Sequence, residues 1–332
     1  GTLDFYSSGN NTLQNTNELK SVIINDLNFN SINYFSNLGF NTKFDINLKN
    51  LNSVGKNSQN YKSSPQVEMV SLFNLDASIP LIKDDETYIN YLTPKISFKF
   101  NPSDMKNYSD SSNQIDIGNI FSNNRLGLDD TFEAGRSLTL GLDYKKERKD
   151  ELSKINKYFE LKLATVLRDK EENFINTKST LNRKSSNLFG SISSNISENL
   201  NINYNFAIDN NYKNFEYNNL NASLSINNFI TKLKFIEENG EMGDSNVLEN
   251  EIGYRFNDEN YLSFNTRRNR KLNLTEYYDL VYEYQNDCLT AGVKYKKSYY
   301  EDRDLKPTEN LLFTITLFPL TTYEHDGRDL FN

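Results

Sequence analysis

The sequence has very few of the side chains on which most catalytic and metal sites depend. Its 332 residues include one histidine, His325, one cysteine, Cys288, and no tryptophan. A histidine-based triad and a zinc site built from Cys and His clusters both need more of these residues. We therefore expect no enzyme activity, no cofactor and no metal centre. Carboxylate pairs such as Asp129 and Asp130 leave a calcium site as an alternative, although aspartates in loops usually shape turns.

Three further absences narrow the class of protein. No run approaches the roughly 20 apolar residues of a membrane-spanning helix. Lys and Arg number 37 against 45 Asp and Glu, a net charge of −8, which argues against a nucleic-acid partner. The chain opens GTLDFYSSGN, without a Met, a basic start or an apolar run, so we expect a mature or truncated chain rather than a signal peptide.

Alternation of apolar and polar residues is the strongest signal that is present. In residues 136–147, most alternate positions are Leu or Tyr, and Ser, Thr, Gly and Asp lie between them; residues 200–208 and 288–296 alternate in the same way. Successive side chains of a strand point to opposite faces, so a period of two predicts β-strands and not helices. The residues of the first run that we expect to face lipid are Leu138, Leu140 and Leu142.

About 16 runs of this kind fill the sequence, a number typical of outer-membrane barrels. We predict an all-β, antiparallel transmembrane β-barrel over residues 1–320 and a short periplasmic tail over 321–332. The predicted strands are 1–6, 19–33, 38–50, 66–81, 88–100, 136–147, 155–167, 185–196, 200–208, 213–226, 228–236, 246–256, 260–267, 275–285, 288–298 and 309–319.

The predicted connections alternate between short and long, which favours a barrel over a soluble sandwich. Links such as 34–37 and 286–287 are short, whereas 7–18, 51–65 and 101–135 are long. Bacterial barrels have tight periplasmic turns and longer external loops. This asymmetry predicts that the last strand ends in the periplasm. A soluble β-sandwich, in which alternation means only that one face is in a core, is the alternative.

The longest predicted connection, 101–135, combines apolar residues with charge. Its apolar residues include Ile120 and Leu128, and its charged residues include Arg125, Asp129 and Arg136. Loops longer than about 15 residues tend to be functional or disordered. We expect this one to fold back into the lumen, held by pairing of arginine with carboxylates. An ordinary surface loop with scattered charge is the alternative.

Cys288 follows the tight turn at 286–287, off the expected lipid face and at the expected periplasmic rim. In an oxidising compartment, a lone accessible thiol often implies a partner elsewhere. A small buried residue is the alternative interpretation.

A motif in the long connection resembles a known family. The chain reads NIFSNNRLGLD from residue 119, then EAGR from 133 and LGL from 140. This is similar to the loop pattern F-S-x-N-R-x-x-G-x-D, then G-x-R and a Gly/Leu-rich strand, of the lipopolysaccharide-assembly outer-membrane proteins (the LptD/OstA family), with one residue fewer inside NRLGLD. The resemblance assigns the lumen or loop motif to Asn124, Arg125, Gly127, Asp129, Gly135 and Arg136.

The C-terminal part resembles the same family. A Tyr-rich strand over 277–284 leads to Cys288, then to the sequence KKSYY at 296–300 and a last strand rich in Leu and Phe. The family has one or two cysteines at that turn, bonded to an N-terminal periplasmic domain. The resemblance therefore implies a disulfide between Cys288 and a domain outside this sequence.

The resemblance spans roughly residues 65–320 and implies a transport function. The family barrel has about 26 strands, so this chain would be the C-terminal portion of a larger barrel in the outer membrane of a Gram-negative bacterium. Lipopolysaccharide would enter the membrane through a seam between the first and last strands while its sugars pass through the lumen. The implied partners are lipopolysaccharide, outer-membrane lipid, a plug lipoprotein of the LptE type and a periplasmic bridge protein of the LptA type.

On this interpretation residues 309–319 form the C-terminal side of the seam. Pro319 lacks a backbone N–H, so it either weakens strand pairing at the seam or simply ends the strand. The seam residues, of which all but the proline are expected to face lipid, are Leu311, Phe313, Ile315, Leu317 and Pro319.

Two other functions remain as alternatives. One is a self-contained, 16-stranded porin-like diffusion channel, in which residues 1–6 would pair with 309–319. The other is a soluble or surface-attached β protein that binds glycans through Tyr and Asn.

Overall fold

The computed structural model describes residues 1–332 except 15–16, 59–60, 150–156, 301–305, 318–320 and 327–332. The described residues form 19 strands of one antiparallel sheet and one short 3-10 helix, η1 (Thr177–Ser179). The predicted all-β, antiparallel fold class is confirmed. No helix in the described part of the chain has the length and apolar character needed to cross a membrane.

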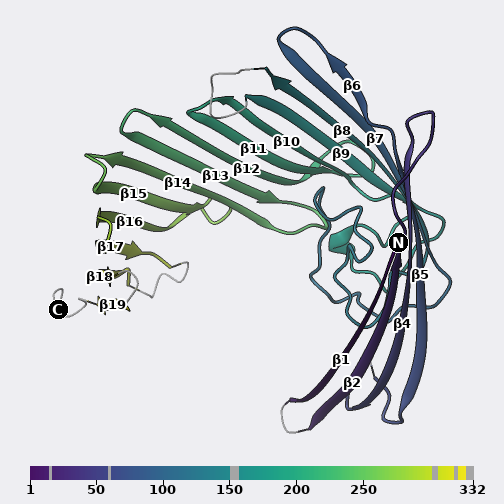
Figure 1. Cartoon of the computed structure of the whole chain (residues 1–332). Helices are drawn as coiled ribbons and strands as arrows, with labels where there is room; N and C mark the ends of the chain where they lie inside the picture. Colours follow the sequence, from purple (N-terminus) through teal and green to yellow (C-terminus); the bar gives the residue numbers. More distant parts are fainter. Residues whose placement is uncertain (15–16, 59–60, 150–156, 301–305, 318–320, 327–332) are drawn as a thin grey trace. The chain divides into compact units, whose positions relative to one another are not determined.

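Contacts divide the chain into two units (Figure 1). The first comprises Gly1–Lys149, Glu160–Ser191 and Ala207–Phe215, and the second comprises Asp150–Phe159, Ile192–Phe206 and Glu216–Asn332. Strands β10 (Leu188–Ser197) and β11 (Leu200–Ile208) contribute residues to both. The strands that lie wholly or mainly in the first unit are β1 (Thr2–Gln14), β2 (Glu18–Asn30), β3 (Tyr34–Phe35), β4 (Asn41–Lys56), β5 (Gln66–Ser78), β6 (Leu81–Asp84), β7 (Tyr88–Asn101), β8 (Gly135–Arg148) and β9 (Tyr158–Arg168).

In the first unit, long strands pair with their neighbours along the chain. Strand β1 pairs with β2, β2 with β4, β4 with β5, β5 with β7 and β7 with β8. The short strands β3 and β6 pair with β4 and β7. The break between β5 and β6 falls at Ile79 and Pro80; proline has no N–H to offer to a strand ladder. Each hairpin is therefore local in sequence.

The polarity of this sheet is the reverse of that in a soluble protein. On β7, Ser97, Lys99 and Asn101 are buried, whereas Ile96 and Phe98 between them are about 41% and 42% exposed. On β8, Ser137 and Thr139 are buried and Leu140 is exposed. An apolar surface facing outward is stable when hydrocarbon surrounds it, as on the outside of a membrane barrel. We call the face with Ser97 and Thr139 the polar face of the first unit.

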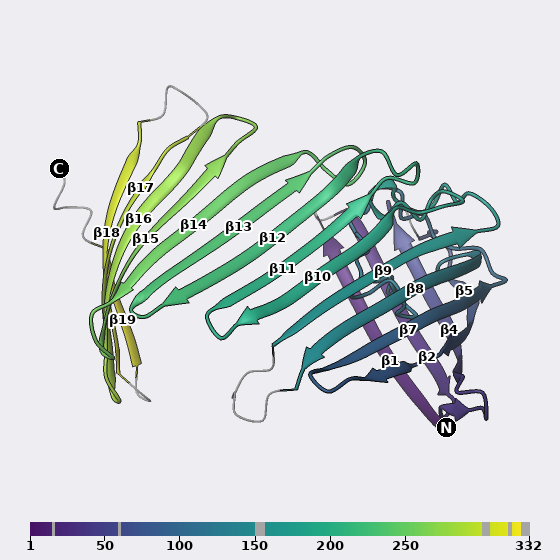
Figure 2. The ribbon, with the colours of Figure 1, turned by 90° about the horizontal axis from the view of Figure 1, so that it is seen from above.

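The second unit is a succession of hairpins (Figure 2). The turn between β12 and β13 contains Asn227, whose φ of 52° lies in the left-handed region that Asn tolerates better than most residues. Each strand from β12 to β18 pairs with the next in the chain. The strands are β12 (Phe215–Ile226), β13 (Phe229–Glu238), β14 (Ser245–Arg255), β15 (Asn260–Asn269), β16 (Leu274–Gln285), β17 (Leu289–Ser298), β18 (Thr308–Leu317) and β19 (Thr321–Asp326).

The two faces of the second unit also differ. One carries a row of ionised side chains, among them Lys232, Glu251 and Arg267, and we call it the charged face. The opposite face is apolar and exposed at Leu233, Ile252, Phe264, Leu280, Val293 and Ile315.

All 16 predicted strands correspond to strands of the structure, but the short strands β3 and β6 lie mostly in predicted connections, and several strand ends differ. Residues 7–14 were expected in a long connection, but they continue β1 in register with 18–25 of β2. Polar cross-strand contacts support this extension, for example the hydrogen bond from Ser7 Oγ to Asn25 Oδ1 (2.7 Å), which apolar alternation does not reveal.

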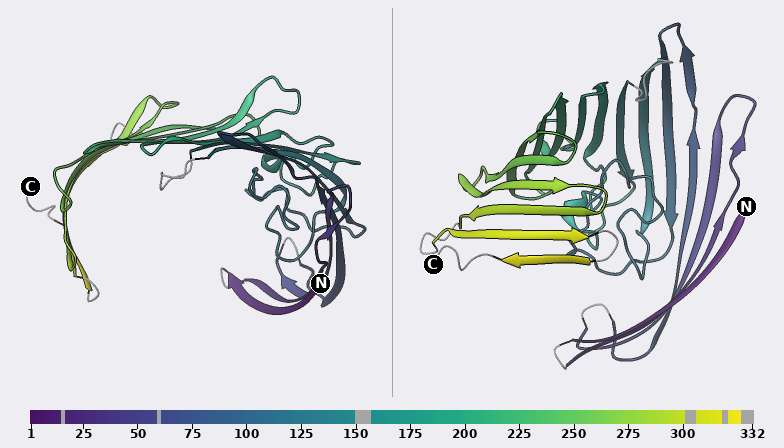
Figure 3. Two further views of the ribbon diagram at one scale, coloured as in Figure 1. Left: turned by 45° about the horizontal axis from the view of Figure 1, so that its top comes forward. Right: turned by 60° about the vertical axis from the view of Figure 1, so that its left-hand side comes forward.

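The C-terminus requires a correction. Residues 321–326, the first part of the predicted tail, form β19, which pairs with β18 (Figure 3, right, yellow strands). Strand β18 is therefore not the last strand of the described sheet. Thr321, Thr322 and Tyr323 are good strand formers, but the acidic residues that follow them made the segment look like a polar tail.

Candidate functional site

The 102–134 segment, which connects β7 to β8, lies over the polar face of the first unit (Figure 1). Both apolar contacts and polar contacts hold the segment against the sheet. Phe132 clusters with Val70 and Leu72 of β5. The buried apolar residues of the segment are Met105, Ile115, Ile120, Leu126, Leu128, Phe132 and Ala134. The predicted fold-back of this segment onto a polar strand face agrees with this geometry.

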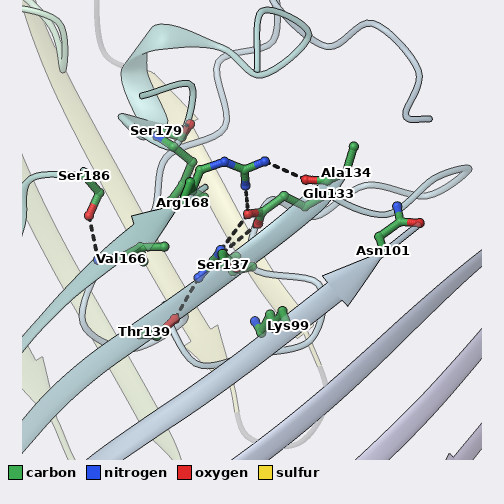
Figure 4. Close-up of polar contacts among 12 residues, drawn as sticks. Lys99, Asn101, Glu133, Ala134, Ser137, Thr139, Val166, Arg168, Ser179 and Ser186 are labelled. Atoms are coloured by element: carbon green, nitrogen blue, oxygen red, sulfur yellow. Dashed lines mark hydrogen bonds and ion pairs between the residues drawn. The ribbon is translucent and has the colours of Figure 1, made fainter. Parts of the chain in front are cut away.

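An ion-pair cluster forms the centre of the contact (Figure 4). Arg125 donates from Nε to Glu133 Oε2 at 2.7 Å and from Nη2 to Glu133 Oε1 at 2.6 Å, so the pair is bidentate. Arg168, the last residue of β9, donates from Nη1 to the same carboxylate and from Nη2 to the carbonyl of Ala134 at 2.5 Å. One buried carboxylate thus holds two buried guanidinium groups.

Arg125 also connects the segment to β8. Its Nη1 donates to Thr139 Oγ1 at 3.0 Å and its Nη2 to Ser137 Oγ at 2.9 Å. These hydroxyls belong to the strand whose alternation was clearest in the sequence. The guanidinium therefore uses its fixed fork of donors to fasten a loop to a strand.

The electrostatics keep Glu133 ionised. Burial by itself raises the pKa of this carboxyl, but Arg125 and Arg168 outweigh it and lower the pKa from 4.5 to about 2. The side chain is a permanent anion at neutral pH. It is a structural counter-ion and not a proton donor or acceptor.

Three more hydrogen bonds attach the segment to the sheet. Lys99 Nζ of β7 donates to the carbonyl of Ser122. Asn101 Nδ2 donates to the carbonyl of Phe132 at 3.2 Å, and Asn123 Nδ2 donates to Asp45 Oδ2 of β4 at 3.1 Å. Because the sheet supplies polar groups on this face, buried backbone groups of the segment find partners there.

A second buried carboxylate, Asp130, binds two tyrosines. Tyr108 donates its hydroxyl to Asp130 Oδ1 at 2.5 Å, and Tyr61, from the connection between β4 and β5, donates to Oδ2. Burial, strengthened by the hydrogen bond to Asp130, raises the pKa of both tyrosine hydroxyls, so they remain protonated donors. This contact ties the segment to a second connection.

The uncharged residues of the predicted motif lie in turns or at the start of a strand. Asn124 and Gly127 shape a turn: Asn124 Nδ2 donates to the carbonyl of Leu128 at 2.8 Å, Leu128 N donates back to Asn124 Oδ1 at 2.8 Å, and Gly127 has a φ of 62°. Gly135 begins β8 with a φ of 82°, which L side chains rarely adopt.

The charged motif residues behave differently from one another. Arg125 is central, but Asp129 is exposed and is not the carboxylate that Arg125 binds. Arg136 is exposed and lies over the Phe100 ring, 5.4 Å from its centroid. Glu133 and Arg168 were not predicted as site residues. Glu133 is part of the EAGR motif, which could have identified it, whereas nothing in the sequence near Arg168 marks it as a partner of a loop 35 residues earlier.

A cavity of about 490 Å³ opens between the 102–134 segment and the sheet. Phe121 lines it and lies directly over Gly141 of β8, where a Cβ atom would be 2.5 Å from Phe121 Cζ. Only glycine leaves room for that ring. The charged residues around the cavity are Lys43, Asp76, Lys95, Asp143 and Lys162.

On the charged face of the second unit, ion pairs run from strand to strand. Lys232 pairs with Glu251 at 3.0 Å, and Arg267 bridges Glu249 at 2.7 Å and Glu276 at 2.5 Å. A second cavity of about 490 Å³ lies over these side chains. Within the part of this unit that the structure describes, side chains of the strands themselves form its lining.

The remaining predicted residues lie at the C-terminal end. Cys288 is exposed and free in the turn between β16 and β17, where its N–H donates to Asn286 Oδ1 at 3.0 Å. Pro319 lies outside the described residues. The other seam residues lie on β18 in register with β17: Leu311 opposite Tyr295, Phe313 opposite Val293, Ile315 opposite Ala291 and Leu317 opposite Leu289. Among the described residues, no group of His, Cys, Asp and Glu side chains is arranged to hold a metal ion.

Comparison with protein families gives one match. The model of the family described as LptD, LPS transport system D, matches residues 10–241, more than two thirds of the chain. The match includes the 119–142 motif and ends before Cys288. A comparison with curated proteins gave no match.

Comparison with solved structures gives weak likenesses. A triple mutant of the Rhodopseudomonas blastica porin is 9% identical, with 90% of this chain and 93% of that chain covered and a TM-score of 0.35. A mutant of the ferric enterobactin receptor of Pseudomonas aeruginosa is 11% identical, with 91% and 54% covered and a TM-score of 0.39. TM-scores this low carry no argument.

Proposed function

Because this chain belongs to the LptD family of LPS transport system D, we propose that it forms part of the wall of an outer-membrane barrel that inserts lipopolysaccharide into the outer leaflet. Proteins of this family are components of a transport system and not enzymes. Membership of the family points to the outer membrane as the location of this chain. In the proposed mechanism, the sugars of lipopolysaccharide move along polar strand faces while its acyl chains leave laterally into lipid.

The reversed polarity of the strands is the observation that supports this proposal. Polar side chains such as Ser97 and Thr139 are buried on one face, while Ile96 and Leu140 are exposed on the other. Hydrocarbon around the sheet would cover the exposed apolar face, and hydrated sugars need the hydroxyl, amide and charged groups that the other face provides.

The seam of this proposal lies further along the chain than the sequence suggested. Strand β18 has a partner on each side, β17 and β19. We therefore propose that β19, which pairs with β18, forms the C-terminal side of the seam. Strand ladders with few hydrogen bonds separate more easily, and the six residues of β19 offer fewer than the ten of β18.

Partners of the barrel are also proposed. Lipopolysaccharide would arrive from a periplasmic bridge protein of the LptA type, and a plug lipoprotein of the LptE type would sit in the lumen. Cys288 is exposed at a turn, which suits a disulfide with a periplasmic domain. Non-reducing electrophoresis of the full-length protein should show a mobility shift that Cys288→Ser abolishes; an unchanged mobility would refute the disulfide.

Depletion of the full-length protein in its host tests the main proposal. Newly made lipopolysaccharide, labelled by a pulse and detected at the cell surface with an antibody to its sugars, should stop arriving and should return when the gene is supplied again. Undiminished arrival would refute the transport function. The porin alternative makes a different prediction: the isolated chain in a planar bilayer would give stable, uniform conductance steps, which the transport proposal does not expect.

A further inference from the structure

The apolar face of the first unit, which lies opposite its polar face, changes character near the start of β7. On this face of β7 the apolar side chains run from Phe100 to Leu92, and Ile96 and Phe98 between them are exposed. That span advances about 26 Å along the strand, or about 20 Å across a membrane at a tilt of about 40°. Since the apolar band of a membrane barrel is about 25 Å tall, Leu92 lies close to its edge. The side chains beyond Leu92 are therefore expected at the level of the lipid headgroups.

Those side chains form a basic row. Partners on paired strands share a face, and the register sets Lys83 of β6 opposite Asn90 of β7, and Asn90 opposite Lys146 of β8. The next row on the same face joins Tyr88 to Arg148. Three cations thus follow directly after an apolar surface.

A groove of about 530 Å³ lies over this row, and both of the lysines line it. The Nζ atom of Lys146 is 4.2 Å from the centroid of the Tyr88 ring, and Tyr144 Oη donates to Asn90 Oδ1 at 3.1 Å. Tyrosine rings at the edges of a membrane protein's apolar surface lie among lipid headgroups. The groove is therefore placed and built to meet a headgroup.

The lining combines apolar and cationic side chains. Leu81 and Leu92, a cross-strand pair, are about 50% and 36% exposed and form the apolar wall of the groove. Asp85 is the carboxylate in the lining, and it pairs with Lys83 at 3.4 Å. One carboxylate against Lys83 and Lys146 leaves a net positive charge, which suits a phosphate.

We propose that this groove binds the headgroup of an anionic glycerophospholipid, with Lys83 and Lys146 on the phosphate and an acyl chain along Leu81 and Leu92. The long 102–134 segment leaves the other end of β7, and the longer connections of bacterial barrels are external. The groove therefore faces the periplasmic leaflet, which is the phospholipid leaflet of an outer membrane. The proposal rests on the outer-membrane location of the chain given above, but not on transport of lipopolysaccharide.

Photo-crosslinking of the full-length protein tests the site. The protein is placed in phosphatidylcholine nanodiscs that contain a trace of phosphatidylglycerol with a diazirine near its headgroup. Adducts located by mass spectrometry should fall within residues 81–92 and 144–148. Lys83→Gln with Lys146→Gln should lower their yield at least about tenfold, because each cation near anionic lipid strengthens binding about fivefold. An unchanged yield would overturn the site.

Two matched variants separate this site from general charge and from misfolding. Lys145→Gln with Lys149→Gln removes the same charge, but Lys145 is on the opposite face of β8 and Lys149 pairs with Asp84. This variant should keep the wild-type yield, and so should Lys83→Arg with Lys146→Arg. Loss of yield in either variant would overturn the site. So would an equal yield from a phosphatidylcholine probe that carries the same diazirine.

Labelling of whole cells distinguishes a phospholipid from lipopolysaccharide as the source of the phosphate. Thr87→Cys, in the turn between β6 and β7, is treated with a maleimide too bulky to pass the outer membrane, and the wild-type protein with its Cys288 is the control. Labelling should require permeabilised cells. Labelling of intact cells would put the groove in the lipopolysaccharide leaflet and overturn the phospholipid assignment. Neither lysine takes part in the proposed transport, so this test and the depletion experiment fail independently.

Discussion

Each unit has a glutamate that pairs with arginine, but the two glutamates differ in how far they are exposed to solvent. In the first unit, Glu133 binds Arg125 and Arg168, and only 10% of its side chain is exposed. In the second unit, Glu249 binds Arg267, and 27% and 39% of the two side chains are exposed. The first arrangement depends on a segment folded over the strands, whereas the second lies within the strands themselves.

The comparison shows that alternating strands leave a polar face whose charges can be satisfied in two ways. A covering segment removes water, so each buried charge needs a fixed partner and losing that partner is costly. An open strand face keeps water, so each ion pair contributes little and can be exchanged for hydration. Loss of an ion-pair partner should therefore destabilise the first unit strongly and the second unit only slightly.

The largest expected effect is at the buried carboxylate. Glu133→Leu leaves Arg125 and Arg168 buried without a counter-ion, and we expect a loss of about 3–5 kcal/mol in the free energy of unfolding. Urea denaturation in detergent micelles measures it. Glu249→Leu is the matched change in the second unit and should cost less than about 1 kcal/mol. Equal losses at the two positions would contradict the contrast between the units.

Low pH should destabilise the first unit by protonating Glu133. The folded-state pKa of Glu133 is about 2, below its ordinary value of 4.5, so its stabilising contribution is complete above pH 4.5 and is lost as the pH falls toward 2. At about 1.4 kcal/mol per unit, the difference corresponds to about 3 kcal/mol. Arg125, Arg168 and Lys99 are the charged groups that face it.

Protease cleavage of the 102–134 segment, followed from pH 5 to pH 2.5 with an acid-active protease, measures this dependence. Glu133→Gln should already be cleaved at pH 5 and should lose that part of the pH dependence. A wild-type profile identical to that of the variant would show that the carboxylate does not hold the segment.

A charge introduced on the apolar face should cost about the same stability in both units, although their polar faces differ. Leu140→Arg in the first unit and Leu280→Arg in the second each place a charge toward lipid, at an expected cost of about 2–4 kcal/mol near the bilayer midplane. Unfolding from lipid vesicles measures it. Thr139→Ser, on the polar face, is the control and should cost less. If spin labels at Leu138 and Leu140 met water while one at Ser137 met lipid, the assignment of faces would be reversed.

A smaller difference is expected at two glycines. Gly141→Ala places a methyl group 2.5 Å from Phe121 Cζ and forces that ring away from the sheet, at about 1–3 kcal/mol. Gly292→Ala on the charged face places its methyl group 2.9 Å from the Thr314 hydroxyl and 3.7 Å from the Tyr282 carbonyl oxygen. Because a hydroxyl moves more easily than an enclosed aromatic ring, this variant should lose less stability than Gly141→Ala. Thermal unfolding of the two variants in one detergent checks the order. A Gly292 variant as unstable as the Gly141 variant would contradict it.

The smallest effect should come from the ladder of the second unit. Lys232 and Glu251 pair at 3.0 Å with side chains that are 55% and 28% exposed. Lys232→Ala should change the free energy of unfolding by about 0.2–1 kcal/mol, and less in high salt. A double-mutant cycle with Glu251→Ala measures the coupling. A coupling above about 2 kcal/mol would mean that this face is as specific as the covered one.

The sequence predicted the strands well because their signal is local. Alternation in 136–147 depends only on neighbouring side chains, and the structure places Leu140 and Thr139 on opposite faces as expected. The ends of strands were less predictable: residues 7–14 and 321–326 pair through polar side chains and backbone, which carry no apolar alternation.

The candidate site was predictable only in outline. Composition indicated that 101–135 would fold back and that an arginine would bind a carboxylate, and in the structure Arg125 binds one. The carboxylate is Glu133 rather than Asp129, because the turn shaped by Asn124 and Gly127 directs the guanidinium toward β8. Arg168 comes from the end of β9, 35 residues further along the chain, and only the fold brings it near.

The outward orientation of side chains such as Phe98 and Leu140 also constrains how the molecule is made. In water these strands cannot bury their apolar side chains. The newly synthesised chain should therefore need a chaperone in the periplasm and a protein complex that inserts it into the membrane. The segments over the first unit are of the opposite kind, with Ile115, Ile120 and Leu181 enclosed. We expect biogenesis to proceed in that order, with the wall assembled on entry into the bilayer and its internal cover closing last.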